Sequence, residues 1–265
     1  MIPVLGVVVP DLFGFVCGLR DSIDVGRILT SHDFDARCHE FFTASAMDEI
    51  EMAVPGWKQM ASYGEGVTLR HTVRAMTALL GLVEYERASA AEQRMMEWTV
   101  LLHDLAKEPR AGHRDFVHAF RSAARAGVVL SEAGFPLTAA FELEFEPWYR
   151  LTYRAHRFDE DHGVEVQDNK AIPEIMDGAD RLFGDAAAVV VKAIALHQSV
   201  TVVTDWPASA PLSREQEAAY IDADVLPVLA AILLADSGGW ELFDQATLAA
   251  MYDQTRTVVR RLGGN

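Results

Sequence analysis

The segment LLHDLAK, residues 101–107, ends a helical pattern that we expect to begin at Ser89. Glu92 follows Ser89 by three residues, which is the spacing of a capping box. Apolar residues fall on both sides of this helix, so we expect it to lie at the centre of the fold. Burying His103 and Asp104 there without partners would cost on the order of several kcal/mol. The segment therefore favours a compensating charge or a metal ion beside these two side chains.

Most of the remaining chain has the spacing of amphipathic helices. The pattern that starts at Thr68, a residue able to cap a first turn, carries His71. Further helices are expected at about 115–133, 138–156, 171–199, 214–236 and 241–262. Gly134-Phe135-Pro136 is a stop signal, and Ser199–Val203 is a β-branched run that could form a strand. The sequence therefore predicts an all-α fold of the helical-bundle type.

Length and composition are those of a folded globular protein. The chain has 265 residues, of which 50% are hydrophobic and 23% charged. It has no flexible linker and no internal repeat, so we expect one domain over residues 1–265. The net charge of −16 disfavours coating of nucleic acid, although a local basic pocket for one small anion remains compatible with it. The charge does not predict an oligomeric state.

The cysteines and the apolar runs indicate the cellular compartment in which we expect the protein. Cys17 and Cys38 cannot build a disulfide framework and fit no metal motif. The apolar N-terminus has no basic region like that of a signal peptide, and Pro10 and Asp11 interrupt it. The apolar run Val225–Ala235 is much shorter than the ~20 residues of a membrane helix. We therefore expect a cytoplasmic protein with no membrane span.

Histidines and aspartates that could hold a metal ion recur along the chain. In order, they are His71, His103, Asp104, His118, His197 and Asp236. Imidazole and carboxylate suit Mn, Fe, Co, Ni or Zn, and a mixture without cysteine favours octahedral, borderline-hard ions. His113 is an alternative to His118, and Asp236 could instead cap the following helix. The other histidines, His32, His39, His156 and His162, lie in polar surroundings and are expected to be solvated.

His71, the HDLAK run and a distant Asp236 together resemble the HD-domain superfamily. Its signature is a histidine, an adjacent His-Asp pair and a late aspartate, each on a different helix of an α-bundle. The similarity covers about residues 66–240, including the segment Gly112–Pro136. Residues 1–65 would then be an N-terminal extension.

The resemblance implies that His71, His103, Asp104 and Asp236 bind a divalent metal ion, with Fe or Mn the expected elements. In binuclear members Asp104 would bridge two ions, and two further histidines complete the set. His118 and His197 occupy plausible positions for them, provided that an insertion lies at about 140–185. One ion or two per chain are both compatible with this pattern.

Cationic residues near these ligands suggest an anionic substrate. Lys107 shares a helical side with His103 and Asp104, and the resemblance carries a functional lysine at its position. Arg121 and Arg125 follow His118 by three and seven residues. We expect Lys107 and Arg121 to contact a phosphate, whereas Arg125 has the pattern of a solvated charge.

Three functions are compatible with these residues. The first is a metal-dependent phosphohydrolase acting on a small phosphate ester or nucleotide, with Asp104 and Lys107 as catalytic residues. The second is an HD-domain di-iron oxygenase that cleaves a C–C or C–P bond with dioxygen. The third is a catalytically silent binding module that contains a metal ion.

Overall fold

The structure is a computed structural model that describes residues 1–108, 115–161, 163–200 and 212–264. Helices make up 73% of it. In the described residues the only sheet is an antiparallel hairpin of β1 (His156–Asp159) and β2 (Val164–Gln167). The expected all-α class is confirmed.

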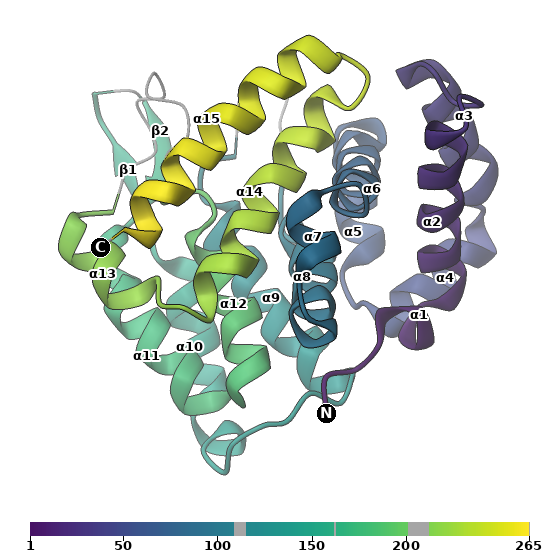
Figure 1. Cartoon of the computed structure of the whole chain (residues 1–265). Helices are drawn as coiled ribbons and strands as arrows, with labels where there is room; N and C mark the ends of the chain where they lie inside the picture. Colours follow the sequence, from purple (N-terminus) through teal and green to yellow (C-terminus); the bar gives the residue numbers. More distant parts are fainter. Residues whose placement is uncertain (109–114, 162, 201–211, 265) are drawn as a thin grey trace.

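Five helices form the centre of the molecule (Figure 1). They are α6 (Val67–Leu79), α8 (Ala90–Leu102), α9 (His118–Glu132), α12 (Asp185–Leu196) and α14 (Val225–Glu241). Helix α14 packs on α6, α8 and α12, and α12 also packs on α8 and α9. Buried alanine, valine, leucine and isoleucine occupy most of α12 and the first half of α14, as expected for helices enclosed by others.

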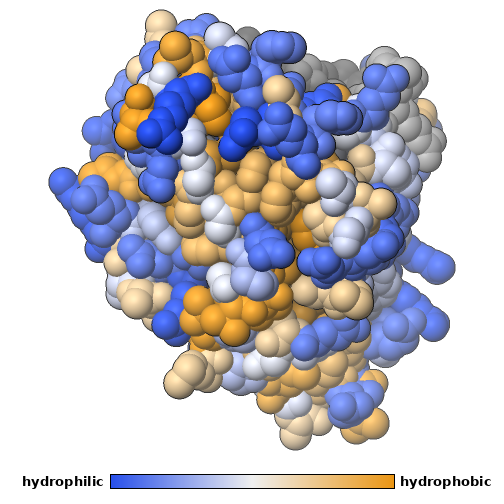
Figure 2. Space-filling model, turned by 90° about the vertical axis from the view of Figure 1, so that its right-hand side faces the viewer, coloured by the Kyte–Doolittle hydropathy of each residue, from blue (hydrophilic) through white to orange (hydrophobic). Residues whose placement is uncertain are grey.

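The N-terminal extension forms a layer of short helices beside α6 (Figure 1). It consists of α1 (Leu5–Val8), α2 (Pro10–Asp24), α3 (Ser31–Phe41), α4 (Ala44–Ala53) and α5 (Trp57–Ser62). An ion pair of 2.6 Å between Asp35 and Arg74 ties α3 to α6. Figure 2 shows the outer face of this layer, on which apolar patches lie between polar side chains. Val7 and Met52 are among its exposed apolar residues.

The remaining helices lie around the centre. They are η1 (Tyr63–Gly66), α7 (Val83–Arg87), α10 (Phe141–Arg154), η2 (Asn169–Ala171), α11 (Ile172–Leu182), α13 (Arg214–Tyr220) and α15 (Gln245–Gly263). Among the described residues no single helix has the length and apolar composition of a membrane span. Helices α13 and α14 have that length and composition only when taken together, and they are bent by 112° relative to each other.

Several expected helix boundaries were wrong. The expected helix 171–199 is broken between α11 and α12 at Phe183 and Gly184, where the Gly184 amide donates to the Pro136 carbonyl. The expected helix 214–236 is broken after Tyr220, and its second part continues to Glu241. The helix that carries His71 is preceded by the left-handed Gly66 rather than capped by Thr68. The capping box at Ser89 is confirmed.

Two further predictions concern strands. The hairpin β1–β2 falls in the segment expected to be an insertion, and it begins at the end of the expected helix 138–156. Of the expected strand Ser199–Val203, the last three residues lie outside the described residues. Sequence periodicity could not reveal the hairpin, because each strand has only four residues and most of β1 is exposed.

Gly178 on α11 allows a close approach to Trp148 of α10. A Cβ atom at Gly178 would lie 2.1 Å from Trp148 Cδ1, and the Trp148 indole N–H donates to the Ile175 carbonyl. We predict that Gly178→Ala lowers the free energy of unfolding by ~1–3 kcal/mol, as overpacking does. Gly14→Ala is the control, because nothing lies within 4 Å of its Cβ position in α2. Urea unfolding should show the control to be neutral or stabilising; equal stability of the two variants would contradict the packing.

Candidate metal centre

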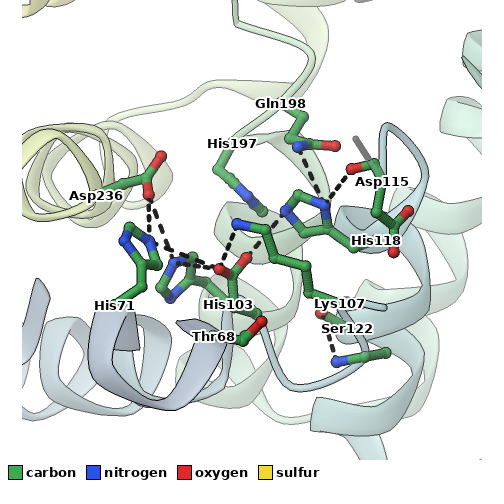
Figure 3. Close-up of polar contacts among 12 residues, drawn as sticks. Thr68, His71, His103, Lys107, Asp115, His118, Ser122, His197, Gln198 and Asp236 are labelled. Atoms are coloured by element: carbon green, nitrogen blue, oxygen red, sulfur yellow. Dashed lines mark hydrogen bonds and ion pairs between the residues drawn. The ribbon is translucent and has the colours of Figure 1, made fainter. Parts of the chain in front are cut away.

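Six histidine and aspartate residues from five parts of the chain converge at the centre of the helices (Figure 3). His71 lies on α6, His103 and Asp104 follow α8, His118 begins α9, His197 follows α12 and Asp236 lies on α14. These are the six residues that the sequence pattern singled out. Except for Asp236, whose side chain is 33% exposed, they are buried.

Asp104 lies between two groups of possible ligands. Its Oδ2 is 3.6 Å from Nε2 of both His71 and His103, and its Oδ1 is 2.9 Å from His118 Nε2. One atom each from His71, His103 and Asp104 lies within 4.8 Å of the others, and the same holds for Asp104, His118 and His197. The arrangement is compatible with a metal site.

Asp236 joins the first of these groups. Its Oδ1 lies 2.8 Å from His71 Nε2 and 3.7 Å from His103 Nε2. Asp236 lies inside α14, which continues without a break through Ser237, Gly238 and Gly239. The alternative in which Asp236 caps the next helix is therefore wrong.

Backbone carbonyls orient three of the imidazoles. Nδ1 lies 2.8 Å from the Val100 carbonyl in His103 and 2.6 Å from the Ile194 carbonyl in His197. His118 Nδ1 lies 2.7 Å from the Asp115 carbonyl. A carbonyl oxygen can only accept, so each Nδ1 carries the proton and donates it. In the neutral form of these rings each Nε2 is then left with a free electron pair, as a metal ligand requires.

The turn after α8 places Asp104 and Lys107 together. Helix α8 ends at Leu102, five residues earlier than expected, and the Lys107 amide donates to the Asp104 carbonyl. The Ala106 amide donates to Ser122 Oγ of α9, which fixes the turn against that helix. The Lys107 ammonium lies 2.6 Å from Asp104 Oδ2. The expected proximity of Lys107 and Asp104 is confirmed, but a turn produces it rather than a helical face.

The Asp115 backbone carbonyl orients His118, and the Asp115 carboxylate pairs with Arg121. Its carboxylate accepts hydrogen bonds from the amides of Glu108 and Val117 and from the Arg121 guanidinium. Arg121 also lies 3.9 Å from Glu108. The guanidinium is therefore already neutralised by carboxylates. Binding of substrate phosphate by Arg121 stays a prediction, and these contacts do not support it.

The charged groups of the cluster shift the pKa values of one another. Burial alone would raise the pKa of Asp104, but His103, Lys107 and His118 outweigh it and hold that pKa well below its usual value. Burial, followed by the charges of His118 and His103, lowers the pKa of His197 to about 3. The pKa of Lys107 is raised despite burial, chiefly by Asp104. At neutral pH Asp104 and Lys107 are charged, whereas His197 is a neutral imidazole.

The donor atoms fit a divalent ion. Within the described part of the chain, His103 Nε2 and Asp104 Oδ1 are buried without a hydrogen-bond partner of acceptable geometry. Buried polar atoms are seldom left in this way, because the loss of water is then uncompensated. Neutral imidazoles and carboxylates are also the ligands that Mn, Fe and Zn prefer. We conclude that this cluster could bind metal.

Three residues around the cluster were not foreseen. The Trp240 ring lies 4.2 Å from the His71 ring, centroid to centroid, and the Gln198 amide nitrogen lies 3.2 Å from His118 Nδ1. A Cβ atom on Gly239 would lie 2.6 Å from His71 Cε1. Only the position of Trp240, four residues after Asp236, could have indicated that it lies on the same side of the helix.

The remaining histidines lie elsewhere or cannot be placed. His156 lies on β1 near Glu165, and His32 and His39 are exposed on α3. His113, the alternative to His118, and His162 lie outside the described residues. His118 itself lies in the cluster, as expected.

Comparisons with protein-family models, with curated proteins and with solved structures found no match for this chain. Membership of the HD-domain superfamily therefore stays a prediction from the residues themselves. The helical fold and the buried cluster are compatible with it.

Gly239→Ala tests whether the approach of α14 to His71 shapes the site. The added methyl group would displace the His71 ring or the helix, since it would also lie 3.1 Å from the His71 carbonyl. We predict an affinity for Mn²⁺ that is lower by about 10- to 100-fold, as for other changes that misorient a ligand. Equilibrium dialysis would measure it. Gly18→Ala on α2 is the control: nothing lies within 4 Å of its Cβ position, so this variant should bind Mn²⁺ with the affinity of the wild type.

Proposed function

We propose that this protein is a metal-dependent phosphohydrolase that acts on a small phosphate ester. The observation that supports this best is the Lys107 ammonium, 2.6 Å from Asp104 at the centre of the His/Asp cluster. Its side chain is 16% exposed, so it lies between the buried ligands and solvent. An ammonium there can contact an anionic group that enters the site.

The residues divide into two sets of ligands. His71, His103, Asp104 and Asp236 would hold one divalent ion, and Asp104, His118 and His197 a second, with Fe or Mn the expected elements. Such ions supply Lewis-acid polarisation of phosphoryl oxygens and lower the pKa of water.

The chain's own residues have three tasks in this proposal. Lys107 neutralises and positions the phosphate, and the Asp104 carboxylate orients the attacking water. The buried imidazoles keep bulk solvent out of the reaction site. Water adds to phosphorus, the ester P–O bond breaks, and the alcohol leaves with a proton. No covalent bond to the protein is needed.

Lys107→Met separates substrate recognition from metal binding, because an ammonium has no electron pair for a metal ion. We expect unchanged metal content and a fall of about 100- to 1000-fold in kcat/KM for phosphomonoesters, the effect of losing one preorganised donor. Metal analysis and phosphate release would be measured together. Lys58→Met, on a lysine 47% exposed and paired with Asp48, is the control. A variant that loses its metal, or keeps full activity on every phosphate ester, would contradict the role of Lys107.

A second candidate is a di-iron oxygenase that cleaves a C–C or C–P bond. The position of Asp104, shared by two ligand groups, favours it because a carboxylate that can bridge two ions suits a binuclear iron centre. An oxygenase requires redox-active iron, whereas a hydrolase accepts redox-inert ions. Consumption of dioxygen with two irons bound, without phosphate release, would favour this alternative.

The number of ions is expected to follow the two ligand groups. We predict two divalent ions per chain in protein purified without chelator, one in His197→Ala and none in Asp104→Ala, because Asp104 belongs to both groups. Elemental analysis would count them. His156→Ala should retain both, since His156 lies on β1 near Glu165 and is not among the grouped ligands. Full metal content in Asp104→Ala would show that the site is assigned wrongly.

A further inference from the structure

Trp240 is a large apolar side chain that remains 49% exposed. It lies in the last turn of α14, which ends at Glu241, and follows Asp236 by four residues. Residues at this spacing lie on the same side of a helix. The indole is therefore next to a proposed metal ligand and also in contact with solvent.

Groups of the site cover part of this indole. The His71 ring lies 4.2 Å away, centroid to centroid, at an interplanar angle of 30°. The Lys107 ammonium lies 5.3 Å from the ring centroid, within the range of a cation–π contact. Gly239 permits this arrangement, because a side chain there would collide with His71. The partly exposed ring thus lies near the ammonium that we assign to phosphate binding.

The most exposed residue of the cluster, Asp236, lies on the side of Trp240. The side chains of His71, His103, Asp104 and His118 are at most 3% exposed, whereas Asp236 is 33% exposed. Asp236 and Trp240 share one side of α14. A substrate that reaches the ligands beside Asp236 would therefore come close to the indole.

We propose that the exposed face of Trp240 stacks on a flat aromatic ring that the substrate carries next to its phosphate. This inference rests on the proposed function and narrows its substrates to phosphate esters with a nucleobase or a similar ring. Aromatic rings pair well with such groups through stacking and loss of hydration, without requiring a particular hydrogen-bond pattern. Lys107 and Trp240 would then recognise the charged and the flat part of one ligand.

Titration calorimetry of the metal-loaded protein tests the proposal with three probes: adenosine monophosphate and ribose phosphate, both as phosphonate analogues that water does not cleave, and adenosine. Trp240→Leu keeps an apolar cover on His71 but removes the stacking surface. We expect its Kd for adenosine monophosphate and adenosine to rise about 5- to 100-fold, and its Kd for ribose phosphate and its metal content to stay unchanged. The Kd values of Trp240→Phe for adenosine monophosphate and adenosine should fall between those of Trp240→Leu and the wild type. Phe158→Leu, at a 59% exposed ring on β1, is the control and should not differ from wild type.

The outcomes separate this proposal from the proposed function. Equal affinity of the wild type for adenosine monophosphate and ribose phosphate would overturn the role of Trp240 and leave phosphate binding intact. Equal weakening of all probes in Trp240→Leu, or loss of metal, would show that the indole serves only to cover His71. Binding of adenosine through Trp240, with no binding of ribose phosphate and no phosphate release, would support the stacking site and refute the phosphohydrolase. Absence of binding by any probe would overturn both.

Discussion

The buried carboxylate of Asp104 constrains the rest of the structure. A carboxylate taken from water into a helical core remains ionised only where opposite charges and donors surround it. Asp104 is 1% exposed, and Lys107, His118, His71 and His103 all lie within 3.6 Å of its oxygens. These groups come from α6, α9 and the turn after α8. The close packing of helices far apart in sequence thus provides the environment that Asp104 requires.

The backbone determines which atoms face the centre. Three of the four imidazoles donate from Nδ1 to a carbonyl three residues earlier, so their orientation follows from local chain geometry. His71 has no such contact, and α14 holds its ring instead. Gly238 and Gly239 let α14 approach α6 closely: a Cβ on the first would lie 2.4 Å from Ala78 Cβ, and one on the second would meet His71. Asp236 reaches His71 because both glycines lack side chains.

The sequence predicted the helical class and all six residues of the cluster, because both depend on patterns that are local or ordered along the chain. Hydrophobic periodicity revealed α6 and α8, and the residue types of the His/Asp set revealed a possible metal site. The breaks at Gly184 and after Tyr220 were missed, since tertiary contacts such as the Gly184–Pro136 hydrogen bond decide them. Spacing along the chain predicted that Arg121, like Lys107, would contact a phosphate. Only the structure shows that Asp115 engages Arg121.

The difference between these two cations affects how the proposed reaction would depend on metal. Because Asp115 and Glu108 neutralise Arg121, Lys107 faces the two carboxylates of the cluster without help from that guanidinium. Two buried carboxylates face one ammonium and the His103 imidazole, whose pKa Asp104 raises despite burial, while the chain as a whole carries a formal charge of −16. The net charge of the chain would repel a phosphate at long range. Divalent ions would add positive charge at the ligands, so we expect binding of the proposed anionic substrate to require bound metal, with Lys107 and the indole of Trp240 determining where the substrate lies.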